Sequence, residues 1–142
     1  MTLYKGQCHC GAIEIEYTSA VAPANAEVRA CQCSFCRKHG ALATSDPDGH
    51  LRFIERAPGT LNRYVFGLKT ADFFTCRACG VYVGIILSDG DRGYGIVNIH
   101  ALADGSRFSA VPIAADYDAE TTADRIARRK QMWTPAEVIP AT

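Results

Sequence analysis

Seven cysteines gather in three short clusters, and this distribution constrains the fold more than any other feature of the sequence. The clusters are CHC at 8–10, CQCSFC at 31–36 and CRAC at 76–79. A lone cysteine in an apolar run usually packs as a small hydrophobic side chain. No cysteine here stands alone, so core packing explains one or two of the seven at most.

Clustered cysteines serve either as disulfide partners or as metal ligands. The opening residues MTLYKGQCHCG lack the apolar segment of a secretory signal, so we expect a cytoplasmic protein. In that reducing compartment, clustered thiols bind metal or act in catalysis more often than they form disulfides. Cys76 and Cys79 have the spacing of a thioredoxin-like redox pair, but the following residues, GVYVGIILSDG, are typical of a strand and not of the helix that this motif needs.

Zinc explains the clusters best, because Zn²⁺ takes four tetrahedral ligands and thiolates suit it. A glycine, Gly11 or Gly80, follows the cysteine pair in CHCG and in CRACG, where it permits a tight turn with positive φ. Two such turns can close one structural site. Its four ligands would be Cys8, Cys10, Cys76 and Cys79.

The remaining three cysteines, Cys31, Cys33 and Cys36, leave a fourth position open. Three protein ligands are the pattern of catalytic zinc, whose fourth position takes water or substrate. The sequence alone does not dictate this division of the seven thiols. His39 is the best histidine candidate for a fourth ligand or a supporting role, ahead of His9, His50 and His100. Arg37 and Lys38 could offset the charge of the site, and Ser34 could donate a hydrogen bond to a thiolate.

Composition places few further limits on function. The 142 residues are 48% hydrophobic and 21% charged, as expected of a single domain over residues 1–142. Basic and acidic residues number 15 each, so no basic excess favours binding to nucleic acid. No run of about 18 apolar residues predicts a membrane span.

Short segments of alternating polarity between glycine and proline turns predict a mainly β domain. One helical turn is expected at 34–40, and a helix capped by Asp118 is expected near the C-terminus. The expected strands cover residues 12–18, 27–32, 41–45, 50–55, 61–67, 72–76, 81–88 and 94–102.

The expected C-terminal helix ends in the basic run Arg128, Arg129 and Lys130. Cations in the last helical turn complement the helix dipole, which is the interpretation we favour. The alternative is that these residues hold an acidic ligand. The only tryptophan, Trp133, follows and is expected in the core.

The segments CHCGAIEIEY, CQCSFCRKHG, FFTCRACGVYVG and RRKQMWTP together resemble the glutathione-dependent formaldehyde-activating (GFA) enzyme family, also called centromere protein V-like, over roughly residues 4–138. The resemblance implies a β-tent fold of antiparallel sheets around a structural zinc, with few helices. It also implies two zinc ions per chain, a structural one on Cys8, Cys10, Cys76 and Cys79 and a catalytic one on Cys31, Cys33 and Cys36. The second ion is expected to be the more labile.

The family's founding activity adds glutathione to formaldehyde and gives S-hydroxymethylglutathione, a reaction classed with the carbon–sulfur lyases. The resemblance therefore implies a zinc-dependent enzyme that acts on an adduct of a small thiol and a small aldehyde. The alternative is a zinc protein that binds glutathione or another thiol without turnover. A third alternative is a structural or protein-interaction domain, against which the odd number of clustered thiols argues.

Overall fold

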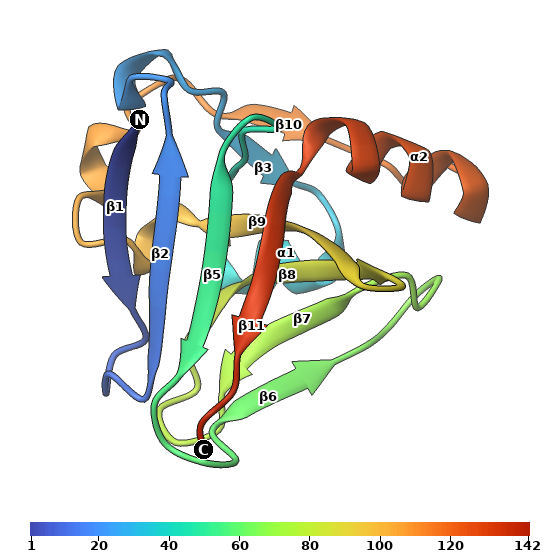
Figure 1. Cartoon of the computed structure of the whole chain (residues 1–142). Coiled ribbons are helices and arrows are strands. Elements are labelled where there is room, and N and C mark those ends of the chain that lie inside the picture. Colours follow the sequence, from blue (N-terminus) through green and yellow to red (C-terminus); the bar gives the residue numbers. More distant parts are fainter.

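Eleven strands and two α-helices account for most of the chain in the computed structural model, which describes residues 1–142 (Figure 1). The helices are α1 (Ser34–His39) and α2 (Thr122–Met132). The strands are β1 (Thr2–Gln7), β2 (Ile13–Ser19), β3 (Arg29–Cys31), β4 (Ala43–Thr44), β5 (His50–Glu55), β6 (Leu61–Tyr64), β7 (Asp72–Cys76), β8 (Tyr82–Asp89), β9 (Arg92–Asn98), β10 (Ile113–Ala115) and β11 (Thr134–Ile139). The mainly β fold with a helix near the C-terminus is confirmed.

The strands form two limbs that meet at β9. The first limb runs in the order β1-β2-β5-β11, and the second contains β6, β7, β8 and β9 and continues through β4, β3 and β10. One edge of β9 pairs with β8, while its other edge pairs with β11 at one end and with β4 at the other. Figure 1 shows the consequence, since β6 to β9 run crosswise behind the first limb.

Most strand pairs are antiparallel, as expected, but two are parallel. Strand β11 lies parallel to β5, and β10 lies parallel to β3. Parallel neighbours need long connections, and both pairs join segments far apart in the chain. Helix α2 belongs to the connection that returns the chain to β11.

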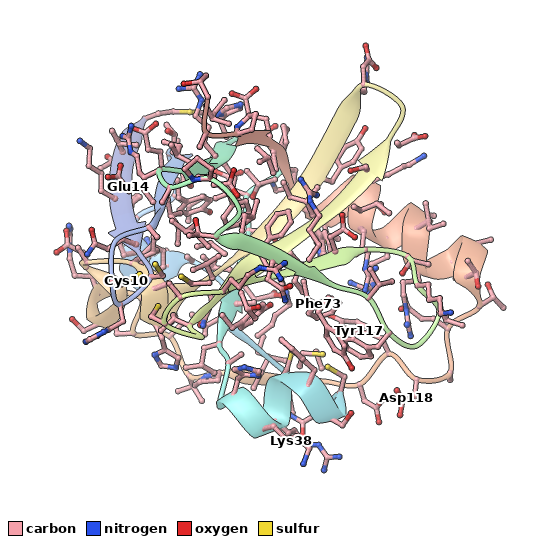
Figure 2. The ribbon with its side chains drawn as sticks, turned by 90° about the horizontal axis from the view of Figure 1, so that it is seen from below. Cys10, Glu14, Lys38, Phe73, Tyr117 and Asp118 are labelled. Carbon is pink, nitrogen blue, oxygen red and sulfur yellow. The ribbon has the colours of Figure 1, made fainter.

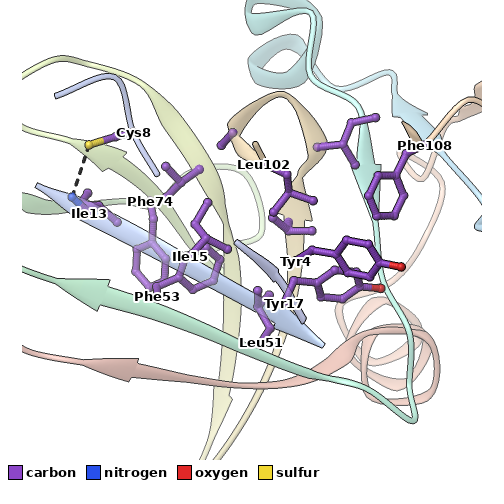
Figure 3. Close-up of a cluster of buried hydrophobic side chains, with 14 of the residues drawn as sticks. Tyr4, Cys8, Ile13, Ile15, Tyr17, Leu51, Phe53, Phe74, Leu102 and Phe108 are labelled. Atoms are coloured by element: carbon purple, nitrogen blue, oxygen red, sulfur yellow. Dashed lines mark hydrogen bonds between the residues drawn. The ribbon is translucent and has the colours of Figure 1, made fainter. Parts of the chain in front are cut away.

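The main core lies between the limbs and comes from the alternating strands predicted by the sequence. Ile13, Ile15 and Tyr17 of β2 are almost completely buried, as are Leu51 and Phe53 of β5. Figure 3 shows these side chains packed with Phe74, and with Tyr4 and Phe108 at one end. Successive side chains of a strand point to opposite faces of the sheet. The alternation of apolar and polar residues therefore gives the first limb one face in the core and one face toward solvent.

A second core covers the opposite face of β7, β8 and β9. Phe73, Tyr82 and Ile85 pack there with Trp133 and with Cys36 of α1. Strands β8 and β9 are therefore buried on both faces, which explains the nearly continuous apolar run VYVGIIL. Burial on both faces also explains why the predicted alternation at 94–102 fails, since Ile96, Val97 and Asn98 are all buried.

Several boundaries differ from the sequence prediction. Strands β5 and β7 begin and end as predicted, but residues Ile99–Ala101 form a 3₁₀ turn instead of extending β9. The N-cap of α2 is Thr121, whose hydroxyl accepts from the Asp124 amide, and not Asp118. Strands β1, β10 and β11 were not predicted. No helix in the structure is long and apolar enough to cross a membrane.

Candidate metal centres and the adjoining cavity

Four cysteines from two distant turns converge at the first candidate metal centre. Cys8 and Cys10 lie in the turn between β1 and β2, and Cys76 and Cys79 lie in the turn between β7 and β8. Their four Sγ atoms all lie within 4.8 Å of one another. The glycines predicted to permit these turns do so, since Gly11 has φ +82° and Gly80 has φ +84°.

The geometry of the four-cysteine cluster fits a metal ion. The Sγ atom of Cys10 lies 3.7 Å from that of Cys8 and 3.7 Å from that of Cys76. Zn–S bonds of about 2.3 Å in a tetrahedron separate neighbouring sulfur atoms by about 3.8 Å, whereas a disulfide needs about 2.05 Å. The Ile13 amide donates to Cys8 Sγ at 3.3 Å (Figure 3), and the Cys79 amide donates to Cys76 Sγ at 3.4 Å. Such donors orient and stabilise thiolate ligands.

The second candidate centre, the triad, consists of Cys31, Cys33 and Cys36. Its Sγ atoms also lie within 4.8 Å of one another. Cys31 ends β3, Cys33 is the N-cap of α1, and Cys36 lies in the first turn of α1, where its amide donates to Cys33 Sγ at 3.3 Å. Hydrogen bonds from the thiols of Cys31 and Cys36 lower the pKa of Cys33 well below its usual 9. Both cysteine clusters could thus bind metal ions.

The two clusters differ in their surroundings, because the triad lines a cavity that the four-cysteine cluster does not line. This cavity has a volume of about 320 Å³ and lies between α1, the β6–β7 loop, the segment before α2, and α2 itself. Figure 2 shows Phe73 and Tyr117, which both line it, on the side of α1 and well apart from Cys10. Part of the cavity wall is apolar and consists of Phe66, Phe73 and Tyr82. Burial raises the pKa of Tyr82 well above its usual 10, so its phenol stays protonated at neutral pH.

Five arginines line the same cavity, namely Arg29, Arg37, Arg125, Arg128 and Arg129. Three of them have carboxylate partners. Glu27 lies 3.4 Å from Arg29, and Glu120 lies 3.4 Å from Arg125 and 2.8 Å from Arg128. The wall that faces the thiols is thus positively charged, which offsets the negative charge of three clustered thiolates.

Arg129 differs from the other arginines because it is buried without a carboxylate partner. Arg129 is only 8% exposed, and its Nε has no hydrogen-bond partner. Nη1 donates to Thr70 Oγ1 at 2.6 Å, and the guanidinium lies over the Trp133 ring, 4.5 Å from the centroid. Burial, together with repulsion by Arg128 and Arg125, lowers the pKa of Arg129 from 12.5 to about 10.

The structure does not bring every predicted residue to the triad. His39 is not among the side chains that could share a metal ion with the triad. Its Nδ1 lies 3.0 Å from the Phe35 carbonyl oxygen, and its ring packs against the Phe35 ring in a tilted arrangement. Arg37 and Ser34 line the cavity, whereas Lys38 does not and projects outward from α1 (Figure 2).

Part of the cavity wall was not predicted from the sequence. Tyr82, Tyr117 and Thr70 come from segments interpreted only as strand or loop. A signal for the arginines was present, since Arg125, Arg128 and Arg129 have the i, i+3, i+4 spacing of one helix face. The dipole interpretation does hold for Lys130, which lies in the last turn and also pairs with Asp89 at 2.6 Å.

Two comparisons with known proteins bear on this site. Residues 3–118 match the sequence model of a protein family, the glutathione-dependent formaldehyde-activating enzymes. This range contains all seven cysteines. A crystal structure of a Rhodobacter sphaeroides protein from a structural genomics programme superposes with a TM-score of 0.58 at 35% sequence identity, covering 78% of this chain and 99% of that chain. The family match ends before α2, so it is shorter than the resemblance over residues 4–138 suggested by sequence.

Proposed function

The chain belongs to the glutathione-dependent formaldehyde-activating enzyme family, and from this premise we propose that it is a zinc-dependent enzyme that forms or cleaves the adduct of a small thiol and a small aldehyde. In that family context the first substrates to test are glutathione and formaldehyde. The observation that carries the proposal is the triad: three thiols, without a fourth protein ligand, face a cavity large enough for a small molecule.

In this proposal the two cysteine clusters have different roles. Cys8, Cys10, Cys76 and Cys79 hold a structural zinc, and Cys31, Cys33 and Cys36 hold the catalytic one. When bound to the triad, zinc would supply an open coordination position at which an incoming thiol loses its proton. The structural site joins a turn of the first limb to a turn of the second, which supports residues 1–142 acting as one domain. None of the seven cysteines forms a disulfide, which supports a location in the reducing cytoplasm.

The addition step needs a nucleophilic sulfur, an oriented carbonyl and a proton. A sulfur–carbon bond forms, the carbonyl π pair moves to oxygen, and that oxygen takes a proton, so the thiol's hydrogen is conserved in the hydroxymethyl product. Tyr82 is the residue best suited to donate a hydrogen bond to the carbonyl oxygen, because its buried phenol lines the cavity and keeps its proton. Phe66 and Phe73 give the cavity apolar wall, and a less polar surrounding strengthens electrostatic interactions.

The proposal is tested by measuring the exchange of ¹³C-formaldehyde with its glutathione adduct by NMR, in the presence of protein loaded with zinc. Wild-type protein should accelerate the exchange above the spontaneous rate, and Cys33→Ser should abolish the acceleration while the fold remains. Cys10→Ser is not a useful control, because it would disturb the structural site. Binding of glutathione without acceleration would favour the non-catalytic thiol-binding protein instead.

A further inference from the structure

The feature that the proposed function leaves unexplained is the buried cation of the cavity, Arg129. A buried charge is strongly unfavourable unless it is paired. Arg129 has the hydroxyl of Thr70 and the ring of Trp133 as neighbours, but no carboxylate. Because these two contacts do not neutralise the charge, the folded chain retains an unpaired cation inside a cavity.

The charged residues near Arg129 do not supply the carboxylate partner that it lacks. The only carboxylate that pairs with arginines of α2, Glu120, serves Arg125 and Arg128. One carboxylate therefore faces three arginines, and the excess positive charge falls on the most buried of them. Asp118 also lines the cavity, but it is exposed and forms no ion pair with these arginines. The cavity thus has room for one more negative group beside Arg129.

The triad and Arg129 line the same cavity of about 320 Å³, so one small molecule can reach both. A thiol is what the triad would take under the proposed function, and a carboxylate is what an arginine prefers as partner. A molecule that carries both groups satisfies the two sites together. The cysteines that define the family match lie within residues 3–118, whereas Arg129 lies beyond that range, so family membership does not assign this residue a role.

We propose that Arg129 is the specificity-determining residue for an acidic thiol, whose carboxylate binds the unpaired guanidinium while its sulfur faces the triad. The binding of the thiol in this inference rests on the proposed function, and the binding of the carboxylate rests on the buried cation. It predicts that the protein selects thiols by charge: a mercaptocarboxylate binds in preference to a neutral thiol, and an aminothiol binds least.

The test uses protein in which cobalt(II) replaces zinc, because thiolate coordination gives cobalt an intense absorption band. Three short thiols are titrated: 3-mercaptopropionate, 2-mercaptoethanol and cysteamine. A hydrogen bond to a charged group contributes about 1.5–3 kcal/mol, so the acidic thiol should bind wild type about tenfold to a hundredfold more tightly than the neutral one. Arg129→Gln should remove this preference and leave the affinity for 2-mercaptoethanol unchanged.

Two further variants make the comparison specific. Arg129→Lys keeps the charge and should retain part of the preference, and it also serves if Arg129→Gln fails to hold cobalt. Arg107→Gln removes an exposed arginine that does not line the cavity and should behave as wild type. Equal affinities for the acidic and neutral thiols in wild type would overturn the inference. So would a parallel loss of affinity for both thiols in Arg129→Gln, since Arg129 would then only neutralise the metal-bound triad.

A second readout separates failure of this inference from failure of the proposed function. Trp133 is the only tryptophan, and its ring contacts Arg129, so its fluorescence reports on the guanidinium. Propionate, which has no thiol, should change this fluorescence in wild type but not in Arg129→Gln. If no thiol perturbs cobalt while propionate still binds, the carboxylate subsite stands and the thiol chemistry of the proposed function fails. If propionate does not bind and thiols bind without charge preference, the proposed function stands and the subsite does not exist.

Discussion

Replacing one cysteine by serine in each cluster should separate the two sites. Cys76→Ser removes a ligand that is 2% exposed and belongs to the four-cysteine cluster. Cys33→Ser removes a ligand of the triad. We expect the first substitution to abolish or greatly weaken folding and the second to leave the fold intact.

The sequence separation of the ligands sets the size of the first effect. Cys10 and Cys76 are 66 residues apart, so a metal ion that joins them closes a long loop. The chain entropy of such a cross-link is worth about 4 kcal/mol, by the same argument that applies to a disulfide. For a chain of this length that loss lowers the melting temperature by about 15 °C. Because the total stability of a domain is about 5–15 kcal/mol, this loss removes a large fraction of it.

The short separation of the triad cysteines makes the effect of Cys33→Ser on stability small. Cys31 and Cys36 are only five residues apart, so the unfolded chain can also bind metal with the triad, and binding to both states contributes little to folding. Cys33 is also the N-cap of α1, and its Sγ accepts from the Cys36 amide. Serine is a preferred N-cap residue, so the substitution preserves this contact and should cost less than about 1 kcal/mol.

Thermal unfolding followed by circular dichroism, together with metal content per chain, checks both expectations. Cys33→Ser should melt within about 5 °C of wild type and retain one metal ion. Loss of fold in Cys33→Ser as severe as that in Cys76→Ser would refute the division into a structural and an open site. A Cys76→Ser protein that melts like wild type would refute it equally.

Three other outcomes follow from the structure. A chelator should remove the triad metal before the structural one, so thiol titration should show three reactive groups before unfolding begins. Arg129→Met should raise the unfolding free energy measured with urea by up to about 3 kcal/mol, the penalty implied by a pKa lowered from 12.5 to about 10, while binding of acidic thiols is lost. Gly84→Ala should destabilise by about 1–3 kcal/mol or more in the same assay, because a Cβ there would lie 2.5 Å from Phe53 Cζ.

The sequence predicted the two cysteine clusters well, because their spacing is local information. Gly11 and Gly80 mark the tight turns, and the structure places four of the cysteines together as their grouping suggests. Strand β2 was equally predictable, since its alternation corresponds to one buried face. In each case, neighbouring residues in the chain contain the whole pattern.

Features that depend on distant contacts could not be predicted in this way. Strand β11 contains Pro135, a residue that is disfavoured inside strands, and it is a strand because it pairs with β5 and with β9. Arg129 is similar, because a basic residue near a helix end is usually solvated, and only the packing of α2 against Trp133 and the second core buries it. Tertiary contacts decided both the pairing of β11 and the burial of Arg129, which local propensity does not determine.

The origin of the ligands explains why two clusters of one residue type would differ in chemistry. The four-cysteine cluster receives one pair from each limb, so the fold itself supplies the four thiols that a closed tetrahedral site would need. The triad receives all its ligands from β3 and α1, and the facing wall is built from α2 and the β6–β7 loop, which contribute arginines and aromatic rings but no fourth thiol. The triad thus lacks a fourth thiol because the elements opposite it supply arginines and aromatic rings, and under the proposed function this wall would face the bound thiol.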